Sequence, residues 1–372
     1  MSSVLVVGGG IAGNTLTVLL RRAGLDVTLA EIKPDWNVSG SGITLQGNAL
    51  RVLRQAGVWD QVREHGFSFD TVGVIAPDGT VLHVARDLRT GGPDLPATLG
   101  MQRPELQRIL SDAVRASGAE IRLGGTVASL SQDHGGVHVE FTDGTSGHYD
   151  LVAGADGHNS AIRELIGIED RPAPTGMGIW RTPAPRPDGL DRTDLAYGGP
   201  CYIAGYCPTS DTTIYAYLVE PKRDRDAVAP AEYAHEMQRL AEGYGGFWPQ
   251  IRATITDPQQ VNYTWFDRLL VGPPWHRGRV VLAGDAVHSC PPTLAQGAAM
   301  SLEDVSVLAE LLTTHQTWDD ALLSEYAARR YPRVDMVVGA SVQLGQWLLD
   351  GVRDADVPGL IGRTMTAVMD RP

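Results

Sequence analysis

The sequence predicts an α/β fold in which a Rossmann-like domain is combined with a mainly antiparallel β-sheet domain and C-terminal helices. A short apolar strand, a glycine-rich turn, a helical pattern and a second strand follow one another within residues 3–32, which is the order of a parallel βαβ unit. Residues 171–276 lack this alternation, carry many prolines and aromatic residues, and contain strand-like pieces such as 213–219. From residue 296 onward the chain mostly returns to helical spacing.

Length, charge and cysteine content exclude several classes of protein. With 372 residues the chain is too long for one small core, and we expect two domains. The 31 Lys and Arg residues against 44 Asp and Glu give a net charge of −13, which disfavours a nucleic-acid partner. There is no run of about 18 apolar residues, so we expect no membrane span. Because Cys201, Cys207 and Cys290 do not form a disulfide framework and no signal-peptide pattern occurs, we expect a cytoplasmic protein.

A glycine-rich turn near the N-terminus predicts a dinucleotide site. Gly8, Gly10 and Gly13 have the spacing G-x-G-x-x-G between a predicted strand and a predicted helix. The first glycine permits a tight turn, the second lets the backbone approach a pyrophosphate, and the third lets the helix pack closely on the strand. Glu31, at the end of the next predicted strand, can accept hydrogen bonds from ribose hydroxyls. The pattern leaves both NAD and FAD open, and its simpler alternative is a glycine-rich turn with a solvated glutamate.

A second strand–loop–helix pattern spans residues 279–304. A buried strand ends at Gly284, which places Asp285 at the edge of the sheet where open α/β folds bind ligands. Gln296 and Gly297 then open a long amphipathic helix, whose N-terminus can direct N–H groups toward an electron-rich ring. Taken alone, the pattern fits an ordinary loop with a capping aspartate equally well.

A third segment, residues 150–163, contains another buried strand that ends in an Asp-Gly pair. Asp156 and Gly157 form a tight turn, and Ser160 lies near the start of the following helix. Taken alone, this segment is better explained as a plain turn followed by a helix N-cap.

Together and in this order, the three segments resemble the FAD-dependent aromatic hydroxylases, which are class A flavoprotein monooxygenases with the para-hydroxybenzoate hydroxylase fold. Residues 8–13, GGGIAG, resemble the adenosine-diphosphate site of that family, and residues 284–288, GDAVH, resemble its second FAD motif. Residues 154–163 resemble the Asp-Gly segment that the family links to both FAD and the nicotinamide. Residues 42–53 and 101–110 are similar to segments on either side of the flavin. The resemblance implies FAD-binding roles for Gly8, Gly10, Ile11, Ala12, Gly13, Glu31, Ile43, Arg103, Asp156, Asp285, Pro292, Gly297, Ala298 and Ala299.

The resemblance also implies a division of the chain into domains. The FAD-binding domain is expected to be discontinuous and to comprise residues 1–72, 99–170 and 277–340. The substrate domain is expected from residues 73–98 and 171–276. Residues 341–372 would form a C-terminal helical segment.

The function implied is that of an enzyme that uses NADH or NADPH and dioxygen to hydroxylate a small or medium aromatic compound, phenolic or heteroaromatic, through a flavin C4a-hydroperoxide. The cofactor supplies the chemistry, and the protein supplies position, polarity and exclusion of water. Two alternatives stay open: another flavoenzyme on the same fold (a reductase, halogenase or Baeyer–Villiger-type oxygenase), or a non-catalytic flavin-binding partner. The substrate, the regiochemistry, the choice of nicotinamide and the oligomeric state are left open.

Two residues of the second FAD segment depart from the family pattern. The family often has glycine before Gln-Gly and asparagine two residues after it, where this chain has Ala295 and Ala299. Ala295 adds a methyl group near the expected ring, and Ala299 removes an amide side chain. Main-chain contacts to the ring can survive both changes, and the position of the flavin is what they put in question.

Other residues fit a structural role at least as well as a functional one. His134, His138 and His148 lie in a turn-rich β region, but their spacing matches no metal motif, and we expect no metal site. Arg181 fits a solvated arginine better than an anchor for a carboxylated substrate. His288 fits a histidine held by nearby backbone better than a ligand-binding one. No catalytic side chain can be named, including the base that would deprotonate a phenol.

Overall fold

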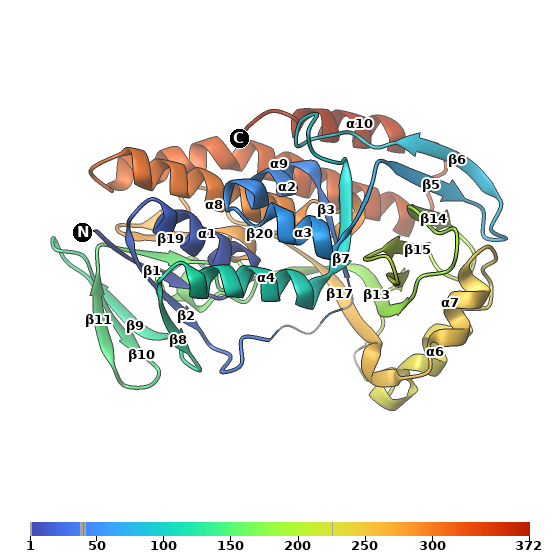
Figure 1. The fold of residues 1–372 in the computed structure, drawn as a ribbon, viewed down its shortest axis with the longest axis horizontal. Helices are drawn as coiled ribbons and strands as arrows, with labels where there is room; N and C mark the ends of the chain where they lie inside the picture. The colour runs from blue at the N-terminus through green and yellow to red at the C-terminus, as the bar shows by residue number, and fades with distance from the viewer. Residues whose placement is uncertain (1, 38–39, 41, 225) are drawn as a thin grey trace.

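The computed structural model describes residues 2–37, 40, 42–224 and 226–372, and its architecture is the α/β arrangement that the sequence predicts (Figure 1). A mainly parallel six-stranded sheet with helices around it forms one part of the molecule, and a mainly antiparallel eight-stranded sheet forms the other. The long helix α9 (Asp320–Leu349) contacts strands of both sheets and so connects the two parts.

The six-stranded sheet has the order β18-β19-β12-β1-β2-β8, and all of its pairings except β18–β19 are parallel. β1 is central because its side chains are apolar on both faces, and Val4 to Val7 are at most 1% exposed. The helix α1 (Ile11–Arg22) connects β1 to β2 and packs against α4 (Arg103–Ala116) and α8 (Gly297–Thr314). The strands are β1 (Ser3–Val7), β2 (Asp26–Glu31), β8 (Glu120–Leu123), β12 (Leu151–Gly154), β18 (His276–Arg277) and β19 (Val280–Leu282).

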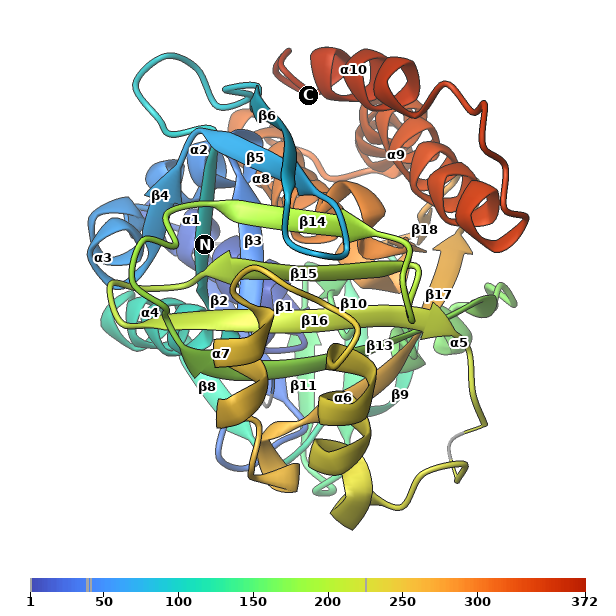
Figure 2. The ribbon, with the colours of Figure 1, turned by 90° about the vertical axis from the view of Figure 1, so that its right-hand side faces the viewer.

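The eight-stranded sheet has the order β20-β17-β13-β16-β15-β14-β5-β6, in which β14 and β5 run parallel and the other neighbours run antiparallel. One of its faces packs on α6 (Tyr233–Ala241) and α7 (Trp248–Thr254) (Figure 2). The buried Trp180 belongs to the same apolar cluster as residues of these helices and so lies on that face. Because strand residues alternate between faces, the next residue, Arg181, lies on the opposite face. The strands are β5 (Thr71–Ile75), β6 (Val81–Arg86), β13 (Ala173–Pro185), β14 (Thr193–Tyr197), β15 (Ile203–Pro208), β16 (Thr213–Pro221), β17 (Asn262–Leu270) and β20 (His288–Ser289).

Two three-stranded antiparallel sheets complete the β structure. The sheet β3-β7-β4 contacts the eight-stranded sheet through β7 and β3, and β3 also contacts the helix α8. The sheet β11-β10-β9 projects from the six-stranded part, at the end of the molecule away from the eight-stranded sheet (Figure 1). The strands are β3 (Gly42–Gln46), β4 (Phe67–Phe69), β7 (Thr98–Gln102), β9 (Val127–Gln132), β10 (Val137–Phe141) and β11 (Ser146–Tyr149).

The segment 47–64, which has a helical pattern in the sequence, forms two helices. Gly57 has φ +81 and follows the first helix, in the position where a left-handed glycine ends a helix.

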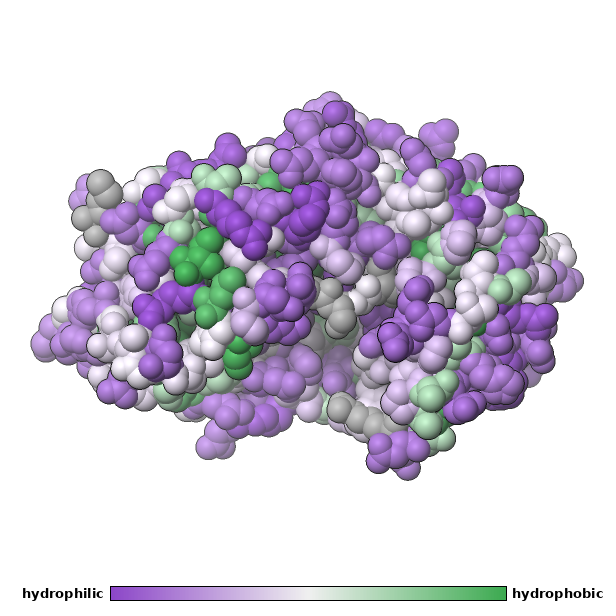
Figure 3. Space-filling view, turned by 60° about the horizontal axis from the view of Figure 1, so that its bottom comes forward, coloured by the Kyte–Doolittle hydropathy of each residue, from purple (hydrophilic) through white to green (hydrophobic). Residues whose placement is uncertain are grey.

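Across the described residues, no helix is both long and apolar enough to cross a membrane. The surface in Figure 3 is mostly hydrophilic, in keeping with the net charge of −13. The remaining helices are α2 (Gly47–Gln55), α3 (Trp59–His65), α5 (Ala161–Leu165) and α10 (Val357–Ala367), with short 3-10 turns at Pro230–Glu232, Pro258–Gln260, Gly284–Ala286 and Pro292–Leu294.

Candidate cofactor and substrate site

The glycine-rich turn between β1 and α1 has the close contacts that its spacing predicts. Gly8 has φ +106, and a Cβ atom there would lie 2.8 Å from the Cα of Asp156, which is closer than side chains allow. Gly13 packs directly on the carbonyl of Gly8, where a Cβ would collide. In contrast, no described atom lies within 4 Å of a Cβ built on Gly10. The turn is therefore closed on its protein side and open where a pyrophosphate would approach.

The N-terminus of α1 is available to an anion. Within the described chain no side chain caps this end, its N-cap is Gly10, and its first turn holds no acidic residue. The N–H groups of Ile11, Ala12 and Gly13 have no acceptor inside the helix, since an α-helix leaves its first N–H groups unpaired. These donors and the partial positive charge of the helix start fit a pyrophosphate.

Both peptide groups of Gly9 are held by side chains. Its N–H donates to Oε2 of Glu31 at 2.6 Å, and Glu31 retains lone pairs for a ribose hydroxyl. The Gly9 carbonyl accepts hydrogen bonds from Asn14 Nδ2 at 2.8 Å, Trp36 Nε1 at 2.9 Å and Gln107 Nε2 at 2.6 Å. The sequence analysis missed these three donors. Asn14 is 0% exposed. A polar residue among the apolar residues of this helix is the feature of the sequence that could have indicated its role.

The late segment meets the early one at the same edge of the six-stranded sheet. Gly284 has φ +64, and a Cβ there would lie 3.2 Å from the Cβ of Ala12. The adjacent Asp285 is exposed, and its Oδ1 accepts a 3.3 Å hydrogen bond from Ser301 Oγ. Its carboxylate is therefore free to accept further hydrogen bonds from ribityl hydroxyls.

The start of α8 resembles the start of α1 in having no side-chain cap and no acidic residue in its first turn, as far as the described residues show. A Cβ built on Gly297 meets no atom within 4 Å, so this helix start also borders open space. Ala295 has φ +52, a left-handed conformation that favours glycine, at the position where the family often has glycine. Among the neighbouring predicted residues, Pro292 is exposed, Ala298 is half-buried, and Ala299 is 1% exposed, so its side chain faces the core.

A buried ion-pair network holds the late segment in place. The carboxylate of Asp304 accepts hydrogen bonds from the Gly284 N–H at 3.0 Å and from Nε of Arg330 at 2.8 Å. It also lies 2.6 Å from Nε2 of His288. Burial opposes ionisation of Asp304, but the charges of His288 and Arg330 hold its pKa below the ordinary value. His288 is therefore held by a buried carboxylate of α8, and not by the nearby backbone that its sequence context favours.

The network extends from α8 to the opposite wall of the site. Glu303, 0% exposed, accepts from Nη1 of Arg330 at 2.9 Å and from Asn48 Nδ2 at 3.3 Å. Asn48 also donates to Oε1 of Gln296 at 2.9 Å, and Gln296 Nε2 donates to Oε1 of Gln46. The N-cap of α8 is thus tied to β3 and α2, which were predicted to lie beside the flavin.

Asp156 reaches the same edge through its backbone, which lies against Gly8. Its carboxylate accepts hydrogen bonds from Ser160 Oγ at 2.5 Å and from the Ile162 N–H at 3.1 Å, so it stabilises the start of α5. Burial raises the pKa of Asp156. The three predicted segments therefore converge, whereas the side chain of Asp156 bonds within its own loop.

Strand β3 lies directly on the eight-stranded sheet. A Cβ on Gly42 would collide with the ring of Tyr215, and Tyr215 Oη lies 2.9 Å from Thr44 Oγ1. The predicted residue Ile43 lies on this strand between them and is half-buried. Arg103, also predicted, is exposed at the start of α4. The cofactor edge and the inner face of the eight-stranded sheet therefore meet at β3.

Arg181 is not the solvated arginine that its sequence context favours. It is half-buried on the inner face of the eight-stranded sheet, where it donates to Thr264 Oγ1 at 2.7 Å. Its Nε is fully buried without a partner, and no carboxylate of the described residues pairs with it. Burial lowers the pKa of Arg181, and the nearby charge of Arg103 adds to this effect. A cation that is partly removed from water without an anionic partner is unfavourable, and an anionic ligand would stabilise it.

A pocket of about 340 Å³ lies beside the ends of β14, β15 and β16. Two of its lining residues, Tyr202 and Leu348, belong to an apolar cluster that includes Tyr217, the strand partner of Arg181. The lining residues are Gly198, Gly199, Pro200, Cys201, Tyr202, Pro221 and Leu348.

The fold and the three converging segments define a dinucleotide-binding α/β protein with a second, antiparallel sheet beside the ligand edge. A family model described as an FAD binding domain matches residues 1–341, so the chain belongs to the FAD-binding family of class A flavoprotein monooxygenases. This confirms the predicted fold class, FAD as the cofactor and the class of enzyme.

Relatives with assigned activities extend over nearly the whole chain. The chain is 32% identical to 2-heptyl-3-hydroxy-4(1H)-quinolone synthase of Pseudomonas aeruginosa over 93% of its own length and 90% of that protein. It is 30% identical to 3-amino-4-hydroxybenzoate 2-monooxygenase PtnB3 of Streptomyces platensis, with coverage of 95% and 92%. Among solved structures, Klebsiella pneumoniae HpxO in complex with FAD and uric acid has a TM-score of 0.86 at 24% identity, covering 100% of this chain and 97% of that one. The structural match shows a shared fold.

Proposed function

We propose that this enzyme uses NADH or NADPH and dioxygen to hydroxylate a small or medium aromatic substrate bound at the inner face of the eight-stranded sheet, beside β3. The observation that carries the proposal is the convergence of the early and late segments, in which Gly284 lies against Ala12 and Gly8 lies against Asp156. Both helix starts at this edge border open space. Relatives whose names specify a hydroxybenzoate, a quinolone or a hydroxynicotinate support an aromatic substrate.

The residues at this edge fit FAD by their donors and acceptors. We assign the pyrophosphate to the N–H groups of Ile11, Ala12 and Gly13, the adenosine ribose to Glu31, and the ribityl hydroxyls to Asp285. When bound, FAD would accept a hydride from the nicotinamide and activate dioxygen.

The chain's own part in the reaction is position and charge. The free N–H groups at the start of α8 would stabilise negative charge on the pyrimidine side of the ring. Asp304 and Gln296 hold that helix start and the preceding turn, so they act by positioning. The β3 strand and the sheet face beyond it would exclude water from the substrate.

Arg181 points to the substrate class. Its guanidinium, which has no carboxylate partner among the described residues, lies one strand away from the stacked rings of Tyr215 and Tyr217, whose centroids are 5.3 Å apart. Aromatic walls suit a flat ring, and the half-buried cation suits a carboxylate or an ionised hydroxyl on that ring. We therefore propose an aromatic acid or an acidic phenol as substrate.

The test is a screen of ring compounds with and without a carboxylate, measured as substrate-accelerated loss of NADH or NADPH by the FAD-loaded protein. Product mass should increase by one oxygen atom. The proposal predicts acceleration by acidic aromatic compounds above the basal rate. A holoprotein whose nicotinamide oxidation never responds to any ring compound would contradict it.

A further inference from the structure

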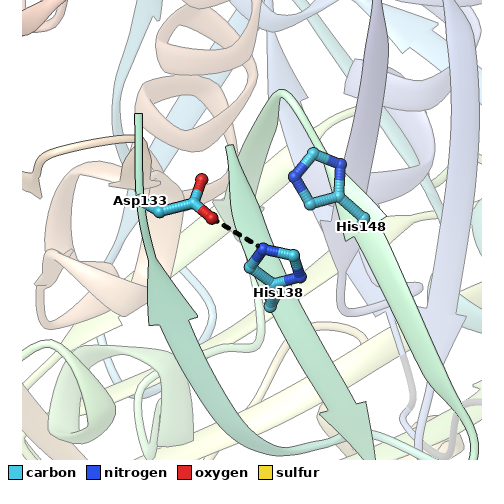
Figure 4. Close-up of side chains that lie close together, drawn as sticks. All are labelled: Asp133, His138 and His148. Carbon is cyan, nitrogen blue, oxygen red and sulfur yellow. Dashed lines mark hydrogen bonds and ion pairs between the residues drawn. The ribbon is translucent and has the colours of Figure 1, made fainter. Parts of the chain in front are cut away.

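Three metal-ligating side chains meet on the outer face of the sheet β11-β10-β9, away from the cofactor edge (Figures 1 and 4). Asp133 directly follows β9, His138 lies on β10, and His148 lies on β11. Each contributes one ligand atom, and these atoms all lie within 4.8 Å of one another. All three side chains are exposed, so an ion could reach them from solvent.

The two histidines are brought together by strand pairing. His138 and His148 are direct partners in the antiparallel β10–β11 pair, and their ring centroids are 4.5 Å apart. Residues directly opposite each other on such a pair share one face of the sheet. The neighbouring Val137 and Val139 are buried, which fixes the histidines on the outer face. Their proximity is therefore a property of the fold and does not depend on chance side-chain rotation.

The carboxylate of Asp133 is oriented toward the histidines by the backbone. Its Oδ1 accepts hydrogen bonds from the N–H groups of Gly135 at 2.7 Å and Gly136 at 3.1 Å. Its Oδ2 is then directed at Nε2 of His138, at 3.0 Å. Hydrogen bonds that orient a ligating carboxylate in this way are a regular feature of metal sites.

The turn also leaves room for the third ligand. Gly136 has φ +154, and a Cβ there would collide with the backbone oxygen of Tyr149 and would also lie 3.0 Å from Nε2 of His148, so the glycine keeps the turn beside this nitrogen free of a side chain. Zinc bonds of about 2.0–2.1 Å in a tetrahedral site separate the ligand atoms by about 3.3 Å. In the structure the three ligand atoms lie within 4.8 Å of one another, so binding of an ion would draw the exposed rings and the carboxylate closer together.

We propose that Asp133, His138 and His148 form a binding site for a divalent transition metal ion such as Zn²⁺. Two imidazoles and one carboxylate are ligands typical of zinc, whereas Mg²⁺ and Ca²⁺ prefer oxygen ligands. Three protein ligands leave a fourth position for water or another ligand. The ion would link β10, β11 and the turn after β9. The spacing of the histidines in the sequence matches no metal motif because strand pairing, not local sequence, assembles the site.

The test is calorimetric titration of the full-length, tag-free, FAD-loaded protein with Zn²⁺ alone. We expect one binding event, and we expect His138→Asn and His148→Asn each to weaken it by at least about tenfold. Asp133→Asn, which keeps the oxygen that accepts from the glycine N–H groups, should also weaken it. His83→Asn is the matched control, since His83 is an exposed strand histidine elsewhere on the surface.

Mg²⁺ at the same concentrations should give no comparable event. Because all three positions are exposed, we expect each variant to fold. The flavin absorbance spectrum and far-UV circular dichroism check that it does. The proposal is overturned by absence of Zn²⁺ binding, by equal binding in the His138→Asn/His148→Asn double variant, or by a loss of binding in His83→Asn equal to theirs.

Discussion

The backbone N–H of Gly284 donates a 3.0 Å hydrogen bond to the buried carboxylate of Asp304. This bond fixes the turn that carries Asp285, so a residue of α8 controls the position of a residue expected to bind the flavin chain. Arg330 holds the other oxygen of Asp304 from α9. The cofactor edge is therefore built on a charge network in the core.

Removal of Arg330 should disrupt this network. In Arg330→Met the carboxylates of Glu303 and Asp304 lose a buried partner, and breaking a buried pair in this way costs about 3–5 kcal/mol. We expect the free energy of unfolding, measured with urea, to fall by that amount and FAD to dissociate more readily. Arg329→Met is the control, because Arg329 makes a more exposed pair with Glu310 and should change stability by less than about 1 kcal/mol. Equal losses in the two variants would refute the role of the network.

Two glycines of the first turn should separate folding from cofactor binding. A methyl group on Gly13 collides with the Gly8 carbonyl, so Gly13→Ala should lower the free energy of unfolding by about 1–3 kcal/mol and weaken FAD binding. A methyl group on Gly10 meets no protein atom, so the free energy of unfolding of Gly10→Ala should be within about 1 kcal/mol of that of the parent protein. The variant should nevertheless bind FAD less tightly. Denaturation curves and FAD titrations check both. Tight FAD binding by Gly10→Ala would argue against a phosphate at this position.

Arg181→Met should reduce activity without reducing stability. The half-buried guanidinium has no anionic partner among the described groups, so its removal should leave the free energy of unfolding unchanged or raised. The KM for acidic aromatic substrates should rise by at least about tenfold, because a charge-assisted hydrogen bond contributes about 1.5–3 kcal/mol. Substrates that lack the acidic group serve as the control and should show little change. A loss of stability with no change in KM would mean that Arg181 is only structural.

Glu236 should contribute a pH-dependent part of the stability. Hydrogen bonds from Arg239, with further support from Arg223, lower the pKa of Glu236 to about 2. Since the unfolded value is about 4.3, the stabilisation is fully present above that pH and is lost as the pH falls toward about 2. Glu236→Gln should therefore show a shallower loss of stability between about pH 4.3 and pH 2. Identical acid-unfolding profiles for the two proteins would count against this.

Local patterns in the sequence were sufficient for the elements around the cofactor. The strand, glycine-rich turn, helix and second strand predicted within residues 3–32 match β1, the turn at Gly8, α1 and β2. These elements could be predicted because apolar periodicity and turn glycines act over a few residues. The family resemblance then indicated which strand ends share one edge.

Features that depend on pairing between distant segments could not be predicted. The burial of Arg181 follows from the register of β13 with β16 and β17 and from β3 lying on that sheet. The hydrogen bond from Gln107 to Gly9 joins α4 to the first turn. The metal-ligating group around His138 and His148 likewise exists only once β10 and β11 pair. The order of residue types along a single sequence does not indicate which distant segments make such contacts.

The central claim is that an early and a late segment of the chain hold one FAD molecule between them, and the affinity of Asp285→Ala for FAD tests it most directly. The variant removes an acceptor for ribityl hydroxyls, whose charge-assisted hydrogen bond contributes about 1.5–3 kcal/mol. Titration of the apoprotein with FAD, monitored by the quenching of flavin fluorescence, should therefore show that the affinity of Asp285→Ala is reduced about 10- to 150-fold. The affinity of Asp285→Asn should lie between those of the parent protein and Asp285→Ala. An unchanged affinity in Asp285→Ala would contradict the account.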